Sequence, residues 1–295
     1  MNSSNEPMLL RERGLCAAAL LAGALLLGAC EKSESDQRGP RGSSQIQIKK
    51  PSAVAALAPI NSIPAAEEPA DIESPPTSEV FVNVKVLNDI SATEFSRLMQ
   101  AFSTWVAPEE GCEFCHNTDK MESDEKYPKV VARRMIQMNR SLNVDWSKHV
   151  GATGVTCYTC HRGNPVPANV WFAPTTPKNN YARPGMGDDA GQNKAEPSIA
   201  LASLPYDPFT PYLRGSEPIR VNTTTALPTG NRASTKQAEH TYSLMLHMSK
   251  SLGVNCTFCH NTQSFLSWNE KRVTAYHGIR MARDVNNAYI EPLTK

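Results

Sequence analysis

The stretch "GVTCYTCHRG", residues 154–163, decides how the rest of this chain is interpreted. It places two cysteines three residues apart, with a histidine directly after the second thiol. The same arrangement occurs twice more, in "GCEFCHNT" at 111–118 and in "NCTFCHNT" at 255–262. The sequence therefore contains an internal repeat, and any function assigned to the chain has to use three copies of this unit.

Three chemistries use paired cysteines, and the histidine discriminates between them. Disulfides suit an exported protein, but they leave the repeated histidine without a role. Structural zinc sites usually close four ligands from two such pairs, so three pairs leave one without a partner. Covalent haem attachment uses every residue, because both thiols add to the haem vinyl groups and the imidazole binds the iron. The motifs predict three covalently bound c-type haems, with thioether bonds at Cys112, Cys115, Cys157, Cys160, Cys256 and Cys259 and imidazole ligands at His116, His161 and His260.

A helix that carries a methionine is expected before each motif. Segments 91–105, 128–142 and 239–252 each have an apolar face of helical period. Their start signals are a Ser91–Glu94 capping box, Pro128 in a first turn and a Ser234–Gln237 capping pattern, and Gly253 marks the end of the third.

A methionine sulfur is a candidate sixth ligand to each iron, and Met/His ligation raises a haem's potential. Filling gaps in the core is the competing interpretation for any single helical methionine. Because three methionines occupy equivalent places, we expect Met99, Met135 and Met245 to be the ligands, with Met138 and Met248 one turn along as substitutes.

The N-terminus is typical of an exported lipoprotein. Arg11 and Arg13 precede an apolar run that ends in the small-residue sequence "LGAC" at 27–30. We expect residues 1–29 to be a signal peptide and Cys30 to be acylated, in a protein held at the periplasmic face of a membrane. An uncleaved membrane anchor is the alternative for this segment.

The remaining organisation follows from composition and period. Residues 30–78 are rich in Pro, Ser and charge, which predicts a disordered tether. Alternating valines at 79–86 predict a short strand. We expect a mainly α protein with two lobes, 79–170 with haems 1 and 2 and 233–295 with haem 3, joined by an irregular connector at 171–232.

The formal net charge of +1 gives no reason to expect a nucleic-acid partner. We find no serine triad, phosphate-binding loop or pair of catalytic carboxylates. A multihaem periplasmic reductase would need an iron without a sixth ligand, whereas here each motif has a methionine available. A periplasmic shuttle that serves respiratory complexes is a further alternative to a fixed electron-transfer subunit.

Several blocks of the sequence carry a family resemblance. "WVAPEEGCEFCH", "YPKVVARRMIQM", "HVGATGVTCYTCHRGNP", "YDPFT", "SLGVNCTFCHNTQSFLSW" and "GIRMARDVNNAYI" resemble the cytochrome subunit of purple bacterial photosynthetic reaction centres. The likeness runs from about Val80 to the C-terminus. It implies a mostly helical, membrane-tethered periplasmic cytochrome that is not an enzyme. Such a subunit docks on the L and M subunits and re-reduces the photo-oxidised special pair. Its own electrons come from a soluble cytochrome c or a high-potential iron–sulfur protein.

The resemblance also assigns roles to single residues. The family's methionine ligands match Met99, Met135 and Met245, and Arg272 matches an arginine that favours a high potential at the third haem. The family usually carries a fourth CxxCH near the C-terminus, which this sequence lacks. His149 matches the histidine that binds that fourth haem, so we expect it to be vestigial here, unless the sequence is part of a longer chain. Without a fourth haem, the third haem is expected to be the immediate donor to the special pair.

Overall fold

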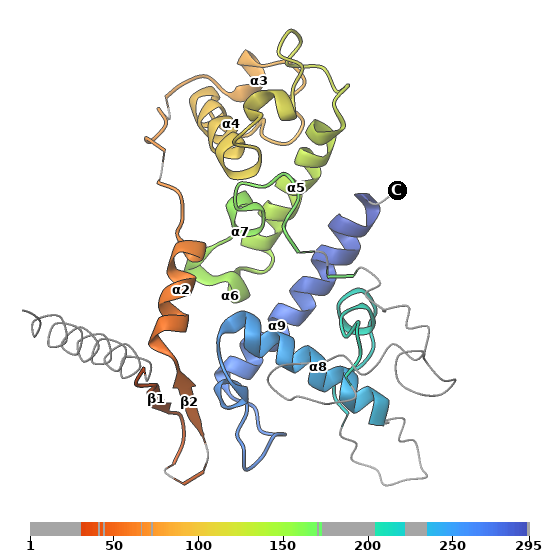
Figure 1. Ribbon diagram of the computed structural model, residues 1–295. Coiled ribbons are helices and arrows are strands. Elements are labelled where there is room, and N and C mark those ends of the chain that lie inside the picture. The colour runs from red at the N-terminus through yellow and green to blue at the C-terminus, as the bar shows by residue number, and fades with distance from the viewer. Residues whose placement is uncertain are drawn as a thin grey trace, which may run out of the picture. The chain divides into compact units, whose positions relative to one another are not determined.

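The computed structural model describes residues 31–40, 42–43, 45–65, 67–71, 73–169, 171–172, 204–221 and 235–293 (Figure 1). The chain divides into two compact units, and each is described separately here. The smaller unit combines the described residues up to Ser62 with Leu252–Ser267, and the larger unit holds Ile63–Ser251 and Trp268 onward. Helices dominate the described structure and the strands form one two-stranded sheet, so the predicted mainly α fold is confirmed.

The larger unit contains most of the helices. They are α3 (Thr77–Val80), α4 (Ala92–Val106), η1 (Gly111–Phe114), α5 (Tyr127–Val144), α6 (Ser147–Val150), η2 (Gly151–Thr153), α7 (Cys157–His161), η4 (Thr210–Arg214), α8 (Thr235–Leu252), α9 (Glu270–Asp284), η6 (Val285–Ile290) and η7 (Glu291–Leu293). The last residue of α8, Leu252, falls in the smaller unit. This unit also holds the first two CxxCH motifs together with α8 and α9, so the two units do not coincide with the predicted lobes.

The expected helix before the first motif is α4. The Ser91 hydroxyl accepts a hydrogen bond from the Glu94 backbone N–H at 3.2 Å, as predicted from their spacing. The Glu94 carboxylate pairs with Arg97 at 2.9 Å, one turn along. The start signal is therefore half of a capping box, and it fixes the helix that carries Met99.

The second and third expected helices are α5 and α8. Pro128 lies in the first turn of α5, as predicted. Helix α8 ends at Leu252, where Gly253 has φ of +63° and reverses the chain as expected of a stop signal. Ser234, the predicted cap of α8, lies outside the described residues.

A small hydrophobic core joins α8 to the segment before it. Phe209, Tyr212 and Leu244 are buried together, and the Tyr212 hydroxyl lies 2.9 Å from that of Thr241 on α8. Residues 204–221 belong to the predicted connector, and they supply part of this core. Most of the remaining connector lies outside the described residues.

Helix α9 lies against two other parts of the larger unit. The Arg283 guanidinium donates to the Tyr212 carbonyl, and the Asp284 carboxylate accepts from the Trp146 indole at 3.1 Å. Gly278 faces the ring of His149 so closely that a Cβ there would lie 2.7 Å from the imidazole Cε1. A glycine at this position is what allows α6 and α9 to approach.

The predicted strand at 79–86 is wrong. Residues 77–80 form the short helix α3, and the chain then runs irregularly, with Asn83 in the left-handed region at φ of +63°. The alternating valines line a cavity instead of joining a sheet. Apolar alternation indicates a half-buried face, but only Val84 and Val86 are partly buried here, whereas Val80 and Val82 are exposed.

The smaller unit holds the sheet. Strands β1 (Glu34–Gln37) and β2 (Ile46–Lys49) pair antiparallel, with Glu34 opposite Lys49, and α2 (Pro51–Asn61) follows. The third motif belongs to the same unit and forms η5 (Cys256–Phe258). The tether predicted to lack regular structure therefore contains two strands and a helix.

Candidate haem sites

The first motif is wound into a single turn. Gly111 starts it at φ of +59°, and the N–H groups of Cys115 and His116 both donate to the Cys112 carbonyl, at 3.2 and 2.9 Å. This winding brings the two thiols and the imidazole to one side of the loop. The sequence spacing predicted that arrangement, because three residues make about one helical turn.

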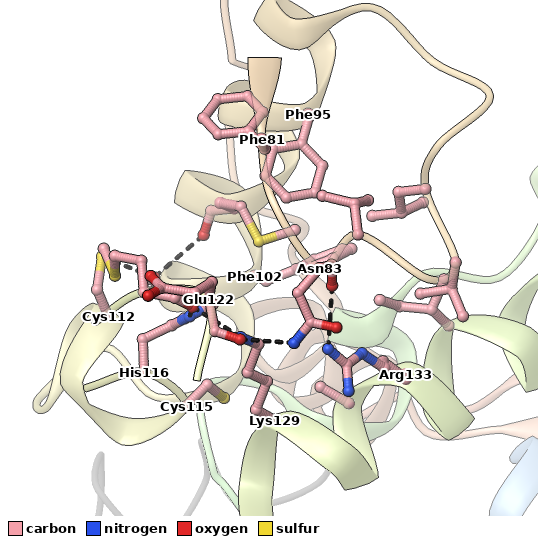
Figure 2. Close-up of a pocket in the computed structure, with 18 of the residues that line it drawn as sticks. Phe81, Asn83, Phe95, Phe102, Cys112, Cys115, His116, Glu122, Lys129 and Arg133 are labelled. Carbon is pink, nitrogen blue, oxygen red and sulfur yellow. Dashed lines mark hydrogen bonds between the residues drawn. The ribbon is translucent and has the colours of Figure 1, made fainter. Parts of the chain in front are cut away.

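These side chains face an apolar cavity of about 500 Å³. Figure 2 shows Phe81 and Phe95 on the opposite side of the cavity from Cys112, Cys115 and His116. The sulfur-bearing Met99 also lines it, as do Val80 at the end of α3 and three valines of the irregular segment that follows, Val82, Val84 and Val86. Two thiols, an imidazole and a thioether around one apolar chamber are the donor set that a c-type haem requires, so the residues present fit that group.

Backbone carbonyls orient two of the three motif histidines. Nδ1 of His116 lies 3.0 Å from the Met121 carbonyl, and Nδ1 of His161 lies 2.9 Å from the Asn164 carbonyl. A carbonyl only accepts, so Nδ1 must carry the proton and Nε2 keeps its lone pair. Each ring is therefore held in the tautomer that can bind iron through Nε2.

The second motif forms α7, and Asn143 of α5 holds the loop before it. Its amide oxygen accepts from the Val155 N–H and its amide nitrogen donates to the Val155 carbonyl, both at 2.8 Å. After the motif, Gly163 donates its N–H to the Trp105 carbonyl of α4 at 2.9 Å. The second motif is thus bound to the helix that carries Met99 and to the helix that carries Met135.

The third motif is held by the β1–β2 hairpin, far away in sequence. The Asn255 N–H donates to the Gln47 amide oxygen at 2.8 Å, and the Gln45 amide donates to the Asn261 side chain at 3.0 Å. The Thr262 hydroxyl donates to the Ser43 carbonyl at 2.5 Å. Hydrogen bonds therefore hold this loop on both sides of its cysteines.

Burial alters the acidity of the motif thiols. It raises the pKa of the Cys115 and Cys160 thiols, and it raises the pKa of Cys157 to about 11. These groups are neutral at physiological pH in the unmodified chain. All six motif cysteines are free thiols, and no group of three or more His, Cys, Asp and Glu side chains in the described residues could hold a metal ion.

A charged cluster lies at the edge of the first cavity. The Asp124 carboxylate accepts from Arg133 and Lys85, both at 2.8 Å, and from the Asn83 amide at 2.9 Å. These bonds, with that of Arg133 the largest cause, lower the pKa of Asp124. The cluster ties the irregular segment that contains Asn83 to α5, and so closes this side of the chamber.

The other predicted site residues lie on described elements, with one exception. Met135 is a half-buried residue of α5, and Met245 packs with Met248 against the Phe209–Tyr212–Leu244 core. Met245 belongs to the larger unit and His260 to the smaller one, so their pairing at one iron stays a prediction. The acylation site Cys30 lies outside the described residues.

The structure also gives surroundings for the two residues assigned by resemblance. Nδ1 of His149 is buried and has no hydrogen-bond partner among the described residues. The Arg272 guanidinium lies over the Trp268 ring, 4.3 Å from its centroid, and burial, followed by the charge of Arg220, lowers its pKa. Neither observation tests the assigned role.

Sequence reasoning missed the groups that support the motifs. They are the carbonyls of Met121 and Asn164, the amide of Asn143, the Asp124 cluster and the hairpin glutamines. An asparagine follows the histidine in two motifs, as Asn117 and Asn261. The sequence does not indicate their partners, which are Glu125 and Gln45.

A mainly helical chain built around three CxxCH loops, with oriented imidazoles and an apolar chamber that contains a thioether, defines a multihaem c-type cytochrome. Comparison with known proteins specifies which kind. Residues 30–295 match the family model of the photosynthetic reaction centre cytochrome C subunit. The chain belongs to this family, and its role is electron transfer in a photosynthetic reaction centre.

Individual relatives agree with the family model. The chain is 51% identical to the photosynthetic reaction center cytochrome c subunit of Rubrivivax gelatinosus, over 95% of this chain and 75% of that protein. It is 46% identical to the subunit of the same name from Thermochromatium tepidum, over 95% of this chain and 69% of the relative. With the subunit from Roseobacter denitrificans it shares 40% identity, over 73% and 61% of the two chains.

A reaction-centre subunit is membrane-associated. Among the described residues, no helix is both long and apolar enough to cross a bilayer.

Proposed function

We propose that this subunit re-reduces the photo-oxidised bacteriochlorophyll special pair with electrons from a soluble periplasmic donor, such as a cytochrome c or a high-potential iron–sulfur protein. The observation that carries the proposal is the first site. There two thiols, an imidazole fixed in the iron-binding tautomer and a methionine sulfur line one apolar chamber. A haem bound there supplies a one-electron couple, and Met/His ligation favours a high potential.

The chain's own residues have distinct tasks at the three sites. The six motif cysteines hold the haems by thioether bonds, and the imidazoles of His116, His161 and His260 bind the irons. The sixth ligands are Met99, Met135 and Met245. Phe81, Phe95 and the valines that line the first chamber give it an apolar wall.

The proposed position at the membrane follows from acylation of Cys30 at the periplasmic face, beside the L and M subunits. Only three residues lie between Cys30 and Glu34, the first residue of β1, so that stretch spans at most about 14 Å. The third motif packs in the same unit as β1. A lipid at Cys30 would keep the third motif close to the membrane, which supports the haem at this motif as the immediate donor.

Haem analysis of the purified mature chain tests the cofactor. A pyridine haemochrome assay combined with intact mass should give one covalently bound haem for each of the three motifs. A colourless chain, or one that holds zinc or cystine at these thiols, would overturn the proposal.

The partner and the direction of electron flow need a separate test. Solubilised photosynthetic membranes should yield this chain together with bacteriochlorophyll-binding subunits. After a flash, the haem at Cys256 and Cys259 should be oxidised first. Purification without those subunits, or equally fast oxidation of all three haems, would contradict the assignment.

A further inference from the structure

A buried lysine shares a hydrogen-bond acceptor with the first motif's histidine. The Met121 carbonyl lies 3.0 Å from Nδ1 of His116 and accepts from the Lys129 ammonium at 2.6 Å. Lys129 lies in the first turns of α5 and is only 9% exposed. One oxygen therefore links the charge of the lysine to the ring proposed to bind iron.

The lysine is held in this position by several groups. Its ammonium also donates to the Ser123 carbonyl at 2.9 Å, and the Asp124 carboxylate lies 3.7 Å away. Asp124 is already paired with Arg133 and Lys85, so it neutralises the lysine only in part. Figure 2 shows Lys129 and His116 on the same wall of the cavity.

This placement is unusual for a lysine. Lysine side chains are rarely buried unless they are paired, and burial in fact lowers the pKa of this one. A structural role would be served by any donor that ties the 121–123 loop to α5. A cation at the wall of an apolar chamber does something further, because its field is weakly screened there.

We propose that Lys129 raises the reduction potential of the first haem. This inference rests on the proposed function, since it requires a haem at Cys112 and Cys115. Two effects have the same sign. The positive charge favours the reduced iron, which carries one positive charge fewer than the oxidised iron. The ammonium also competes for the Met121 carbonyl, which weakens the bond from His116 Nδ1 and makes the ring a poorer electron donor to iron.

The test is a redox titration of the full chain with and without this charge. Lys129→Met should lower the midpoint potential of the first haem by about 59 mV, which is a tenfold change in a one-electron equilibrium. The other two haems should keep their potentials. Lys129→Gln keeps a donor to the carbonyl but removes the charge, so it should lower the potential by less than Lys129→Met.

The matched control is Lys120→Met, which removes an exposed lysine from the same loop region. It should leave all three potentials unchanged, and Lys129→Arg should leave the first potential close to that of the parent. A Lys129→Met protein with an unaltered first potential would overturn the inference, as would a raised one. A parent chain without haem at Cys112 would instead refute the proposed function, and the haem assay detects that outcome first.

Discussion

The hairpin that holds the third motif permits a prediction with a matched control inside the same chain. Thr262 follows the third motif's histidine and donates its hydroxyl to the Ser43 carbonyl. Thr118 occupies the same place in the first motif, where it is exposed. Replacement by valine keeps the shape of either side chain and removes the hydroxyl. The two substitutions therefore separate the hairpin contact from the change in residue type.

The magnitude follows from the bonds that are lost. Thr262→Val removes one hydrogen bond, worth about 1 kcal/mol net, so the 255–262 loop should open about fivefold more often. Gln47→Met should do more, because the N–H of the partly buried Asn255 then loses its acceptor, the amide oxygen of the buried Gln47. A fully buried N–H without a partner costs about 1–3 kcal/mol, so for this partly buried group the upper bound is opening about 150-fold more often.

Backbone amide exchange measured by mass spectrometry reads out this opening directly. Peptides that cover 253–264 should exchange faster in both variants, in the order Gln47→Met, Thr262→Val and parent. Peptides that cover 111–118 should be unaffected by either change. Thr118→Val should match the parent everywhere. Equal exchange of the third loop in all four proteins would refute the reasoning that the hairpin holds it.

Three further outcomes follow from other parts of the structure. Leu244 is 1% exposed, so Leu244→Ala should lower the free energy of unfolding by about 2–5 kcal/mol in urea titrations, whereas the exposed Leu252→Ala should change it by less than about 0.5 kcal/mol. Because Arg133 lowers the pKa of Asp124 below its unfolded value of about 3.9, the folded state binds fewer protons, so the stabilisation persists above about pH 4 and declines below it. Thermal denaturation in acid should therefore lose part of its pH dependence in Asp124→Asn, and an unchanged profile would contradict the ion-pair account. Met245→His should lower the potential of the third haem and slow re-reduction of the special pair, and a titration that leaves this potential unmoved would exclude the sulfur as a ligand.

Local signals predicted the three helices that precede the motifs. The cap at Ser91, the proline at 128 and the stop at Gly253 each act within one turn, so the residues beside them contain all the information needed. The donor set of the first site was also predictable, because the CxxCH spacing and the period of α4 place thiols, imidazole and Met99 toward a common interior.

Long-range and backbone-mediated features were not predictable. Strand β2 alternates isoleucine with glutamine, but the glutamines are the buried side chains that contact the third motif, and Ile46 and Ile48 are exposed. The valines at 80–86 have a strand-like period, but they line a chamber and do not join a sheet. Acceptors such as the Met121 carbonyl belong to the backbone, which every residue type shares, so no residue letter indicates them.

The hairpin also has a consequence for the order in which the protein matures. Its glutamines lie more than 200 residues before the loop that they hold. The first strands emerge early from the export machinery, while their counterpart emerges near the end of the described chain. Contacts of such sequence separation form late, because a long loop must close first. The first motif, whose supporting groups lie within about fifty residues, is complete much earlier. Haem should therefore be inserted at the first site before the third. The third site is complete only after its loop has been made and has bound the β1–β2 hairpin.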